Sequence, residues 1–322
     1  MVFRRIDRRG VLTGGGASLL AGRAVAQMLV DRRSSVRRPE GADYEPPDTL
    51  RAVFDLCRRM TAPVRVNGRG PYPFVIDTGA NQSVISERLF TELGLARGPL
   101  ELLNSTTGAQ LASTTTARLS LGARDDNDVV LSILPQYAMG GVGMLGVNRL
   151  EGQRLIMDFA RERLTVESAA RPLTNPDDVV VRATRLRGQL TMVQADLGGI
   201  PVTAFLDSGA ESTIGNRALM ALVQRGRPGA GSADVPVISV TGQTMTAALV
   251  DVDGLRLGGM RLPTWPVAFA DLHAFSLWQL IDRPALMVGV DVLSRFSLVS
   301  LDFTRDEVRF RNLALDGMIV SV

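Results

Sequence analysis

One short run occurs twice in the chain, and its two aspartates lie 207 − 77 = 130 residues apart. The copies are Phe74-Val75-Ile76-Asp77-Thr78-Gly79-Ala80 and Phe205-Leu206-Asp207-Ser208-Gly209-Ala210. In each copy, apolar residues typical of a buried strand end at an aspartate, and a small hydroxyl residue, a glycine and an alanine follow. Glycine permits a tight turn and the close approach of another segment. The repeat therefore predicts two acids that are semi-buried and face each other.

The elements predicted after the two runs come in the same order. Helices are expected over residues 87–93 and 216–224. Polar turn formers follow at 105–110 and 239–244, each stretch containing Thr-Gly between alternating apolar runs that predict a hairpin. An apolar-apolar-glycine run then recurs, ending at Gly146 and at Gly289. Repetition of a whole set of elements indicates two lobes of one fold.

The stretch 141–146 also has the spacing Gly-x-Gly-x-x-Gly, which is typical of dinucleotide-binding loops. Its counterpart at 285–289 keeps only the apolar pair and the last glycine. The chain is also dominated by predicted strands, whereas a dinucleotide-binding fold alternates strands with helices. A buried strand is therefore the better interpretation of this motif.

The single cysteine, Cys57, and the single histidine, His273, exclude several kinds of site. No internal disulfide and no thiolate metal cluster can form. A Ser-His-Asp triad would have to use His273, and no Gly-x-Ser-x-Gly motif accompanies it. We expect no metal and no cofactor, with Cys57 as a small buried filler and His273 as a surface or hydrogen-bonded loop residue.

The formal net charge of +3 comes from residues 1–26, which hold five arginines against one aspartate. Without that segment the charge is 3 − 4 = −1, and no block of one sign remains. The sequence thus argues against a nucleic-acid surface.

Residues 1–26 resemble a twin-arginine export signal. Arg8-Arg9 precedes a weakly hydrophobic stretch that is too short and glycine-rich to span a bilayer, and Ala24-Val25-Ala26 resembles a cleavage site. We expect the export machinery as a partner, a periplasmic or secreted location, and no stable membrane anchor after signal cleavage. The alternative is a disordered basic tail. Residues 27–49, rich in arginine and proline, are expected to be a flexible leader.

The two Asp-Thr/Ser-Gly-Ala runs resemble those of the aspartic proteases, and Ala80 and Ala210 are more similar to the retropepsin-like branch than to the pepsin branch. The resemblance covers about residues 50–312. It implies an all-β, mainly antiparallel fold of two pseudo-twofold-related acid-protease lobes with short helices. The expected boundaries are an N-terminal lobe over 50–170, a linker over 171–178 and a C-terminal lobe over 179–322.

The resemblance further implies a catalytic dyad of Asp77 and Asp207. Two acids a few ångströms apart in a low-dielectric cleft do not both ionise, so one can activate a water while the other holds a proton. The predicted hairpins at 105–110 and 239–244 would be flaps that cover an extended substrate. The strands that end at Gly146 and Gly289, named glycine strands below, would run beside the catalytic loops. By role, the remaining residues are Thr78, Gly79, Ala80, Ser208, Gly209 and Ala210 beside the dyad, Thr107, Gly108, Thr241 and Gly242 in the flaps, and Gly146 and Gly289 in the glycine strands.

The expected function is that of a monomeric aspartic endopeptidase acting on a peptide or protein substrate. The alternative is a non-catalytic peptide-binding or scaffold module of the same fold. Neither flap holds the tyrosine that the pepsin branch has there. In retroviral enzymes acidic residues follow the Asp-Thr/Ser-Gly-Ala run, whereas this chain has Asn81-Gln82 and Glu211-Ser212. The substrate preference of those enzymes therefore does not transfer to this chain. Because alanine replaces the hydroxyl residue of the pepsin branch, we expect a mildly acidic pH optimum.

Two segments of the second half have no counterpart in the first half, and each allows two interpretations. A longer connector around 271–281 either lies beside the cleft and makes its halves unequal, or is a surface excursion that packs Trp278 on its own lobe. The apolar tail 318–322 either pairs in the sheet that joins the halves or is a disordered end.

Overall fold

The computed structural model describes residues 49–147, 150, 152–169, 173–186, 189–226, 231–315 and 318–320. The expected export signal, nearly all of the leader and the start of the linker lie outside these residues. No helix within the described ranges has the length and apolar character needed to cross a membrane.

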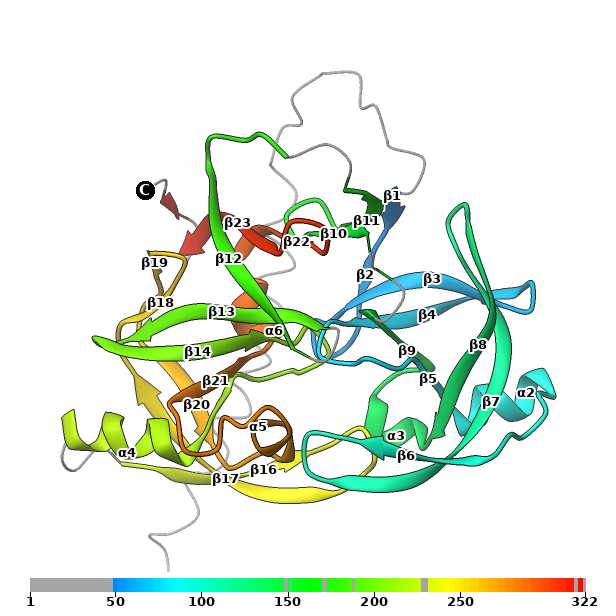
Figure 1. Cartoon of the computed structure of the whole chain (residues 1–322), viewed down its shortest axis with the longest axis horizontal. Helices are drawn as coiled ribbons and strands as arrows, with labels where there is room; N and C mark the ends of the chain where they lie inside the picture. The colour runs from blue at the N-terminus through cyan, green and yellow to red at the C-terminus, as the bar shows by residue number, and fades with distance from the viewer. Residues whose placement is uncertain are drawn as a thin grey trace, which may run out of the picture. The chain divides into compact units, whose positions relative to one another are not determined.

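The first lobe is an eight-stranded sheet in the order β2-β3-β4-β9-β5-β8-β7-β6, drawn from blue to green in Figure 1. A further pairing of β3 with β7 closes the sheet into a barrel-like lobe. Its elements are β2 Val53–Phe54, β3 Met60–Val66, β4 Arg69–Asp77, β5 Val84–Ser86, α2 Glu87–Leu93, β6 Leu100–Asn104, β7 Ala109–Leu121, β8 Arg124–Leu134, α3 Gln136–Met139 and β9 Gly143–Gly146.

Local sequence signals account for several of these boundaries. The turn between β3 and β4 is formed by Asn67 and Gly68, whose φ angles of 50° and 79° suit a two-residue hairpin. Helix α2 starts after Ser86, whose Oγ accepts a hydrogen bond from the Leu89 amide at 3.1 Å. It ends at Gly94, where φ is 63° and a side chain would be strained.

The second lobe repeats this order of elements. Its glycine strand β21 runs parallel to β14 and antiparallel to β15, as β9 runs parallel to β4 and antiparallel to β5. Its elements are β12 Asp178–Leu186, β13 Gln189–Leu197, β14 Ile200–Leu206, β15 Ile214–Gly215, α4 Arg217–Gly226, β16 Ala233–Ile238, β17 Thr244–Val252, β18 Leu255–Leu257, β19 Met260–Arg261, β20 Trp265–Phe269, α5 His273–Leu277, β21 Ala285–Val288 and α6 Val290–Leu293.

A shared sheet joins the two lobes in the order β1-β11-β10-β22-β23-β12. Its remaining strands are β1 Thr49–Arg51, β10 Gln153–Asp158, β11 Arg163–Ser168, β22 Phe296–Asp302 and β23 Glu307–Leu315. The seam is the antiparallel pair β10 and β22, in which Met157 lies opposite Val299. The tail forms β24 (Met318–Val320), which pairs with β23 in this sheet, while the seam itself is made by β10 and β22. The all-β fold with two lobes is confirmed.

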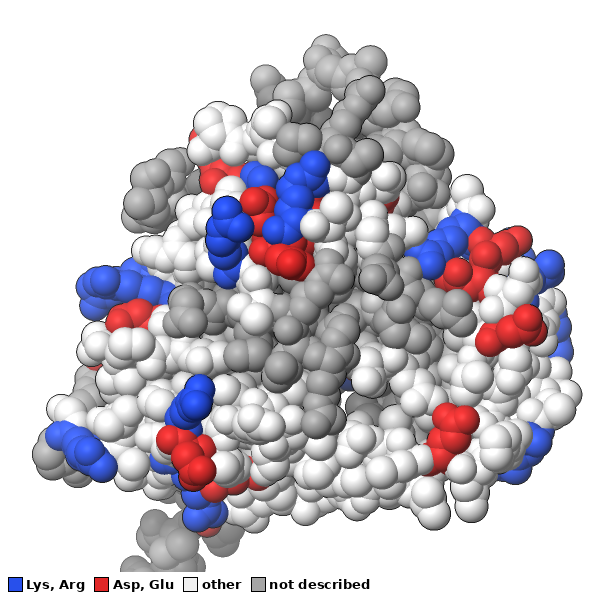
Figure 2. Space-filling model, in the orientation of Figure 1, with Lys and Arg blue, Asp and Glu red and all other residues white. Residues whose placement is uncertain are grey.

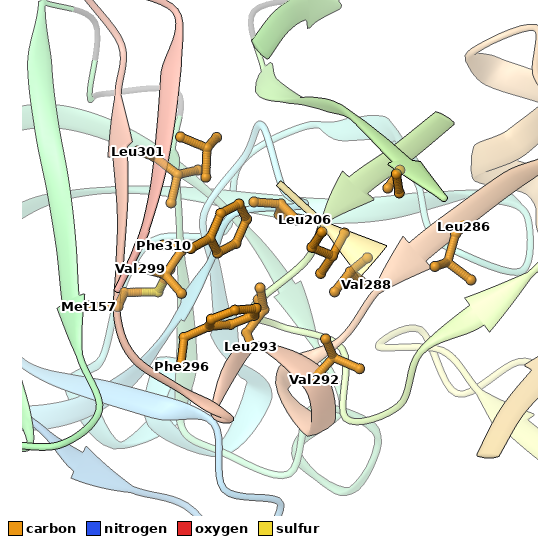
Figure 3. Packing of buried hydrophobic residues seen from close by; sticks show 14 of the residues in the cluster. Met157, Leu206, Leu286, Val288, Val292, Leu293, Phe296, Val299, Leu301 and Phe310 are labelled. Carbon is orange, nitrogen blue, oxygen red and sulfur yellow. The ribbon is translucent and has the colours of Figure 1, made fainter. Parts of the chain in front are cut away.

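The largest hydrophobic core crosses this seam. Met157 of β10 lies in one cluster with Phe310 of β23 and with Leu206 and Val288, the last residues of β14 and β21 (Figure 3), and all four are fully buried. Burying a side chain of this size contributes about 1.5–3 kcal/mol. Because Leu206 directly precedes Asp207, the packing that fixes the seam also fixes the strand that delivers the second acid.

A buried ion pair also crosses the seam. The Nη2 of Arg154 lies 2.8 Å from Oδ2 of Asp302, and both side chains are almost inaccessible to solvent. Burial alone would raise the pKa of Asp302, but hydrogen bonds from Arg154 and from the amides of Arg305 and Thr304 bring it below its ordinary value. Asp302 therefore stays ionised and is balanced by the charge of Arg154, because a buried charge needs a partner. On the outer face shown in Figure 2, acidic and basic side chains are interspersed.

Candidate active site

The two acids of the repeat meet at the junction of the lobes. Asp77 ends β4 and Asp207 directly follows β14, with exposed fractions of 9% and 7%. Each carboxyl group lies against the glycine of the opposite loop, Asp77 against Gly209 and Asp207 against Gly79. The Gly79 amide donates to Oδ1 of Asp77 at 2.9 Å, and the Gly209 amide donates to Oδ1 of Asp207 at 3.0 Å. The Ala210 amide donates to the same Asp207 oxygen at 3.1 Å.

The hydroxyl residues after the acids lock the two loops together. The Thr78 Oγ1 donates to the Leu206 carbonyl at 2.9 Å and accepts from the Ser208 amide at 2.9 Å. The Ser208 Oγ donates to the Ile76 carbonyl at 2.7 Å and accepts from the Thr78 amide at 3.1 Å. All four bonds are buried and cross between the lobes. These bonds hold the ends of β4 and β14 side by side, and this keeps Asp77 next to Asp207.

The glycine strands lie beside the catalytic loops in both lobes. A β-carbon at Gly146 would lie 2.9 Å from the Ala80 carbonyl oxygen, and one at Gly289 would lie 2.6 Å from a Ser212 backbone atom. The Gly146 amide donates to Ser83 Oγ, and the Gly289 amide donates to Thr213 Oγ1, each at 3.1 Å. Sequence reasoning missed these two hydroxyls, although the repeat contains the signal: 83 − 77 = 213 − 207 = 6.

Burial raises the pKa of both acids above the ordinary value for aspartate, and the charge of Asp207 raises the pKa of Asp77 further. Asp207 accepts two backbone amides and Asp77 accepts one. The pair titrates as a unit, so over a range of pH the two carboxyl groups hold one proton between them.

The two predicted flaps are hairpins, β6–β7 and β16–β17, which contact each other at their tips. Thr107 Oγ1 donates to Oε1 of Gln243 at 3.2 Å, and Thr241 Oγ1 donates to Ser105 Oγ at 3.4 Å. The flap residues that line the cleft are 103–106 and 235–240. Of the expected flap residues, Thr107, Gly108 and Thr241 lie where the two hairpins contact each other. Gly242 lies against Tyr137 of α3, since a β-carbon there would come within 2.7 Å of the tyrosine hydroxyl.

The longer connector of the second lobe forms α5 and reaches the first flap. The His273 amide donates to the Thr106 carbonyl at 2.8 Å, and His273 Nε2 lies 3.1 Å from Oδ1 of Asn104. Trp278 packs edge-on against Phe205 of its own lobe, with ring centroids 4.0 Å apart, and also lines the cleft. Each of the two expectations for this connector therefore describes part of it.

The cleft around the acids has a volume of about 790 Å³. Cys57, expected to be a buried filler, is half-buried and lines this cleft, because the loop that carries it lies at the cleft wall. Burial and the neighbouring Glu211 raise the pKa of its thiol. Arg59 and Tyr137 line the cleft as well, and sequence reasoning missed both. Within the described residues, no three His, Cys, Asp or Glu side chains gather as a metal site would.

Two segments of the chain match known protein families. Residues 62–152 match the family described as gag-polyprotein putative aspartyl protease, and residues 193–292 match the family described as aspartyl protease. Each matched segment holds one of the two acids. A search among curated proteins found no match.

Proposed function

Because the chain belongs to the retropepsin-like aspartic protease family, we propose that it is an endopeptidase whose Asp77 and Asp207 activate a water for attack on a peptide bond. The matched segments themselves assign it a function of the protease type. The observation that carries the finer proposal is the pair of buried acids that the two interlocked loops hold at the cleft, both with a raised pKa. Acids perturbed in this way are typical of catalytic sites.

In the proposed reaction the two acids have different roles. The charged Asp207 accepts a proton from the water as the water oxygen attacks the peptide carbonyl carbon. The protonated Asp77 hydrogen-bonds the carbonyl oxygen and stabilises the charge that develops on it. When the carbon–nitrogen bond breaks, a proton from the pair passes to the leaving amine, and the pair returns to holding one proton.

The proposed substrate is an extended peptide segment lying between the hairpins and the acids. The flap residues that line the cleft at 103–106 and 235–240 lie on β6 and β16 and in the turns after them. Both strands lie at the edge of their sheets, so their outward backbone groups can pair with a peptide as an added strand would. Much of the remaining wall is apolar, including Met139, Met287 and Trp278. This supports binding through the peptide main chain, with apolar side chains occupying the wall.

The test compares the wild type with Asp77→Asn and Asp207→Asn on a peptide library across pH. We expect each variant to lose at least about a thousandfold in kcat/KM, because one carboxyl group cannot act as both acid and base. Asp234→Asn is the matched control, since Asp234 is exposed on β16. Wild-type protein that binds peptides without cleaving them would instead support the peptide-binding module.

We also propose that residues 1–26 direct export through the twin-arginine route, on the basis of Arg8-Arg9 and the Ala-Val-Ala pattern. Cell fractionation of the full chain and of a variant with both arginines replaced by lysine tests this. We expect export of the wild type and retention of the variant. Retention of both proteins, or export of both, contradicts the proposal.

A further inference from the structure

Arg59 connects the first lobe to the catalytic loop of the second. It directly precedes β3, and its side chain is buried. Nη2 donates to the Met139 carbonyl at 2.6 Å, and Nη1 donates to the Gly209 carbonyl at 3.2 Å. Nε donates to Oδ2 of Asp55 at 2.7 Å, so that carboxylate orients the guanidinium. One planar group thus ties three segments together, which arginine can do because its donors form a rigid fork.

The carbonyl that Arg59 holds belongs to the glycine packed against the opposite acid. A β-carbon at Gly209 would lie 2.5 Å from Cγ of Asp77. A shift of the Gly209 turn therefore changes the position available to the Asp77 carboxyl. On its other side, Nη2 packs against Gly140, where φ is 68° and a β-carbon would lie 2.8 Å from Nη2, so both the backbone and Arg59 favour glycine there. Segments 139–140 and 209 therefore both pack around the Arg59 guanidinium.

The repeat does not duplicate Arg59. It lies 77 − 59 = 18 residues before the first acid, and the same count before the second, 207 − 18 = 189, gives Gln189. The strand registers, which pair Thr61 with Val75 and Met192 with Phe205, give the next residue, Leu190, and neither residue is a cation. The cation therefore has no equivalent in the second copy of an otherwise pseudo-symmetric pair. The titratable groups around it are its partner Asp55, the two acids, and the cleft-lining Cys57, Tyr137, Glu211 and Asp291. Asp291 accepts hydrogen bonds from Thr213 and Trp265.

The charge of Arg59 acts on both acids. Burial is the strongest influence and raises the pKa of Asp77 and of Asp207, while the guanidinium lowers both. A guanidinium keeps its charge throughout the pH range in which carboxyl groups titrate. Without it, both protonation steps of the pair would move to higher pH.

We propose that Arg59 is a positioning residue of the aspartic pair, whose guanidinium holds the Gly209 turn against Asp77 and whose charge keeps the singly protonated pair available at lower pH. The part of this proposal that concerns catalysis rests on the proposed endopeptidase function. Its two components, geometry and charge, are separable. Lysine keeps the charge but lacks the fork of donors, and glutamine lacks the charge.

The first test measures kcat and KM against pH for the wild type, Arg59→Lys and Arg59→Gln. For Arg59→Gln we expect both limbs of the kcat/KM profile to move up by about 0.5–1 pH unit, with kcat at least about tenfold lower. For Arg59→Lys we expect a lower kcat with the limbs in place. Arg124→Gln is the control, because Arg124 pairs with Asp126 away from the cleft. A wild-type kcat in both Arg59 variants overturns the positioning role.

The second test needs no activity. Carbon-13 NMR of the aspartate carboxyl groups, assigned with Asp77→Asn and Asp207→Asn, follows the titration of the pair directly. We expect higher midpoints in Arg59→Gln, and midpoints near the wild-type values in Arg59→Lys, which keeps the charge. Arg59→Met is a second variant without the charge, and unchanged midpoints in either neutral variant that folds overturn the charge role. A wild type that cleaves no peptide overturns the proposed function only, since the titration is still measured.

Discussion

Gly209 lies directly against the carboxyl group of Asp77, so close that a β-carbon there would come within 2.5 Å of Cγ. Gly79 has the same relationship to Asp207. Each loop therefore supplies its own acid and also the surface on which the opposite acid rests. The distance between the acids is set by this backbone contact as well as by the four hydrogen bonds that lock the two loops together.

We expect Gly209→Ala to separate the pair. The added methyl group has to displace the Asp77 carboxyl, which costs about 1–3 kcal/mol of stability and lowers kcat/KM by at least about a hundredfold. Thermal unfolding and peptide hydrolysis measure the two effects. Gly226→Ala is the matched control, since a β-carbon at Gly226 meets no atom within 4 Å. Equal losses in both variants contradict the contact model.

Removing the hydroxyl group of Thr78 or of Ser208 is expected to weaken the junction between the lobes. Thr78→Val leaves the Ser208 amide, and Ser208→Ala leaves the Thr78 amide, buried without its acceptor. Each change should cost about 1–3 kcal/mol, measured by urea unfolding. Thr91→Val removes an exposed hydroxyl bond on α2 and should cost far less. If all three variants cost the same, the four bonds across the junction contribute no special stability.

The raised pKa of the acids predicts how stability changes with pH. A raised pKa means that folding disfavours the charged form, so the stabilising contribution is complete below about pH 3.9 and is lost as the pH rises through the folded pKa values. Asp77→Asn cannot ionise at this position. We therefore expect its melting temperature to exceed that of the wild type by a few degrees near neutral pH, with the gap closing in acid. Asp234→Asn should show no such trend, and a gap that widens in acid would reverse the sign of the argument.

The contact between the flaps is expected to affect substrate entry. Gln243→Ala removes the partner of Thr107, so the hairpins should separate more easily while the acids stay in place. We expect KM to change by about threefold to tenfold with kcat within about twofold, and little change in melting temperature. The control Gln224→Ala alters an exposed residue of α4. A large loss of kcat would mean that the flap contact also positions the acids.

Much of the candidate site follows from the sequence because the signal occurs twice. The repeat identified Asp77 and Asp207, and the structure brings them together. Local chemistry predicted the turn at Asn67 and the helix over 87–93, since a left-handed turn and a serine cap depend on adjacent residues.

Contacts that link distant segments could not be predicted in this way. Arg59 has no counterpart in the second copy, so repetition offers no signal for its bond to Gly209. The pairing of His273 with Asn104 joins residues 169 positions apart in different lobes. Alternating hydrophobicity indicates that β10 and β22 are strands, but the pattern does not name the neighbour of either strand.

The seam between β10 and β22 has a consequence for either half in isolation. A separated first half would expose the backbone of Arg154–Asp158 as a bare edge, and Arg154 would lose the buried carboxylate of Asp302. The unpaired N–H and C=O groups of such an edge form hydrogen bonds with a strand of another molecule. Each half of this chain therefore needs the other to fold stably. We expect residues 49–169, expressed alone, to self-associate or aggregate in gel filtration instead of migrating as a compact monomer.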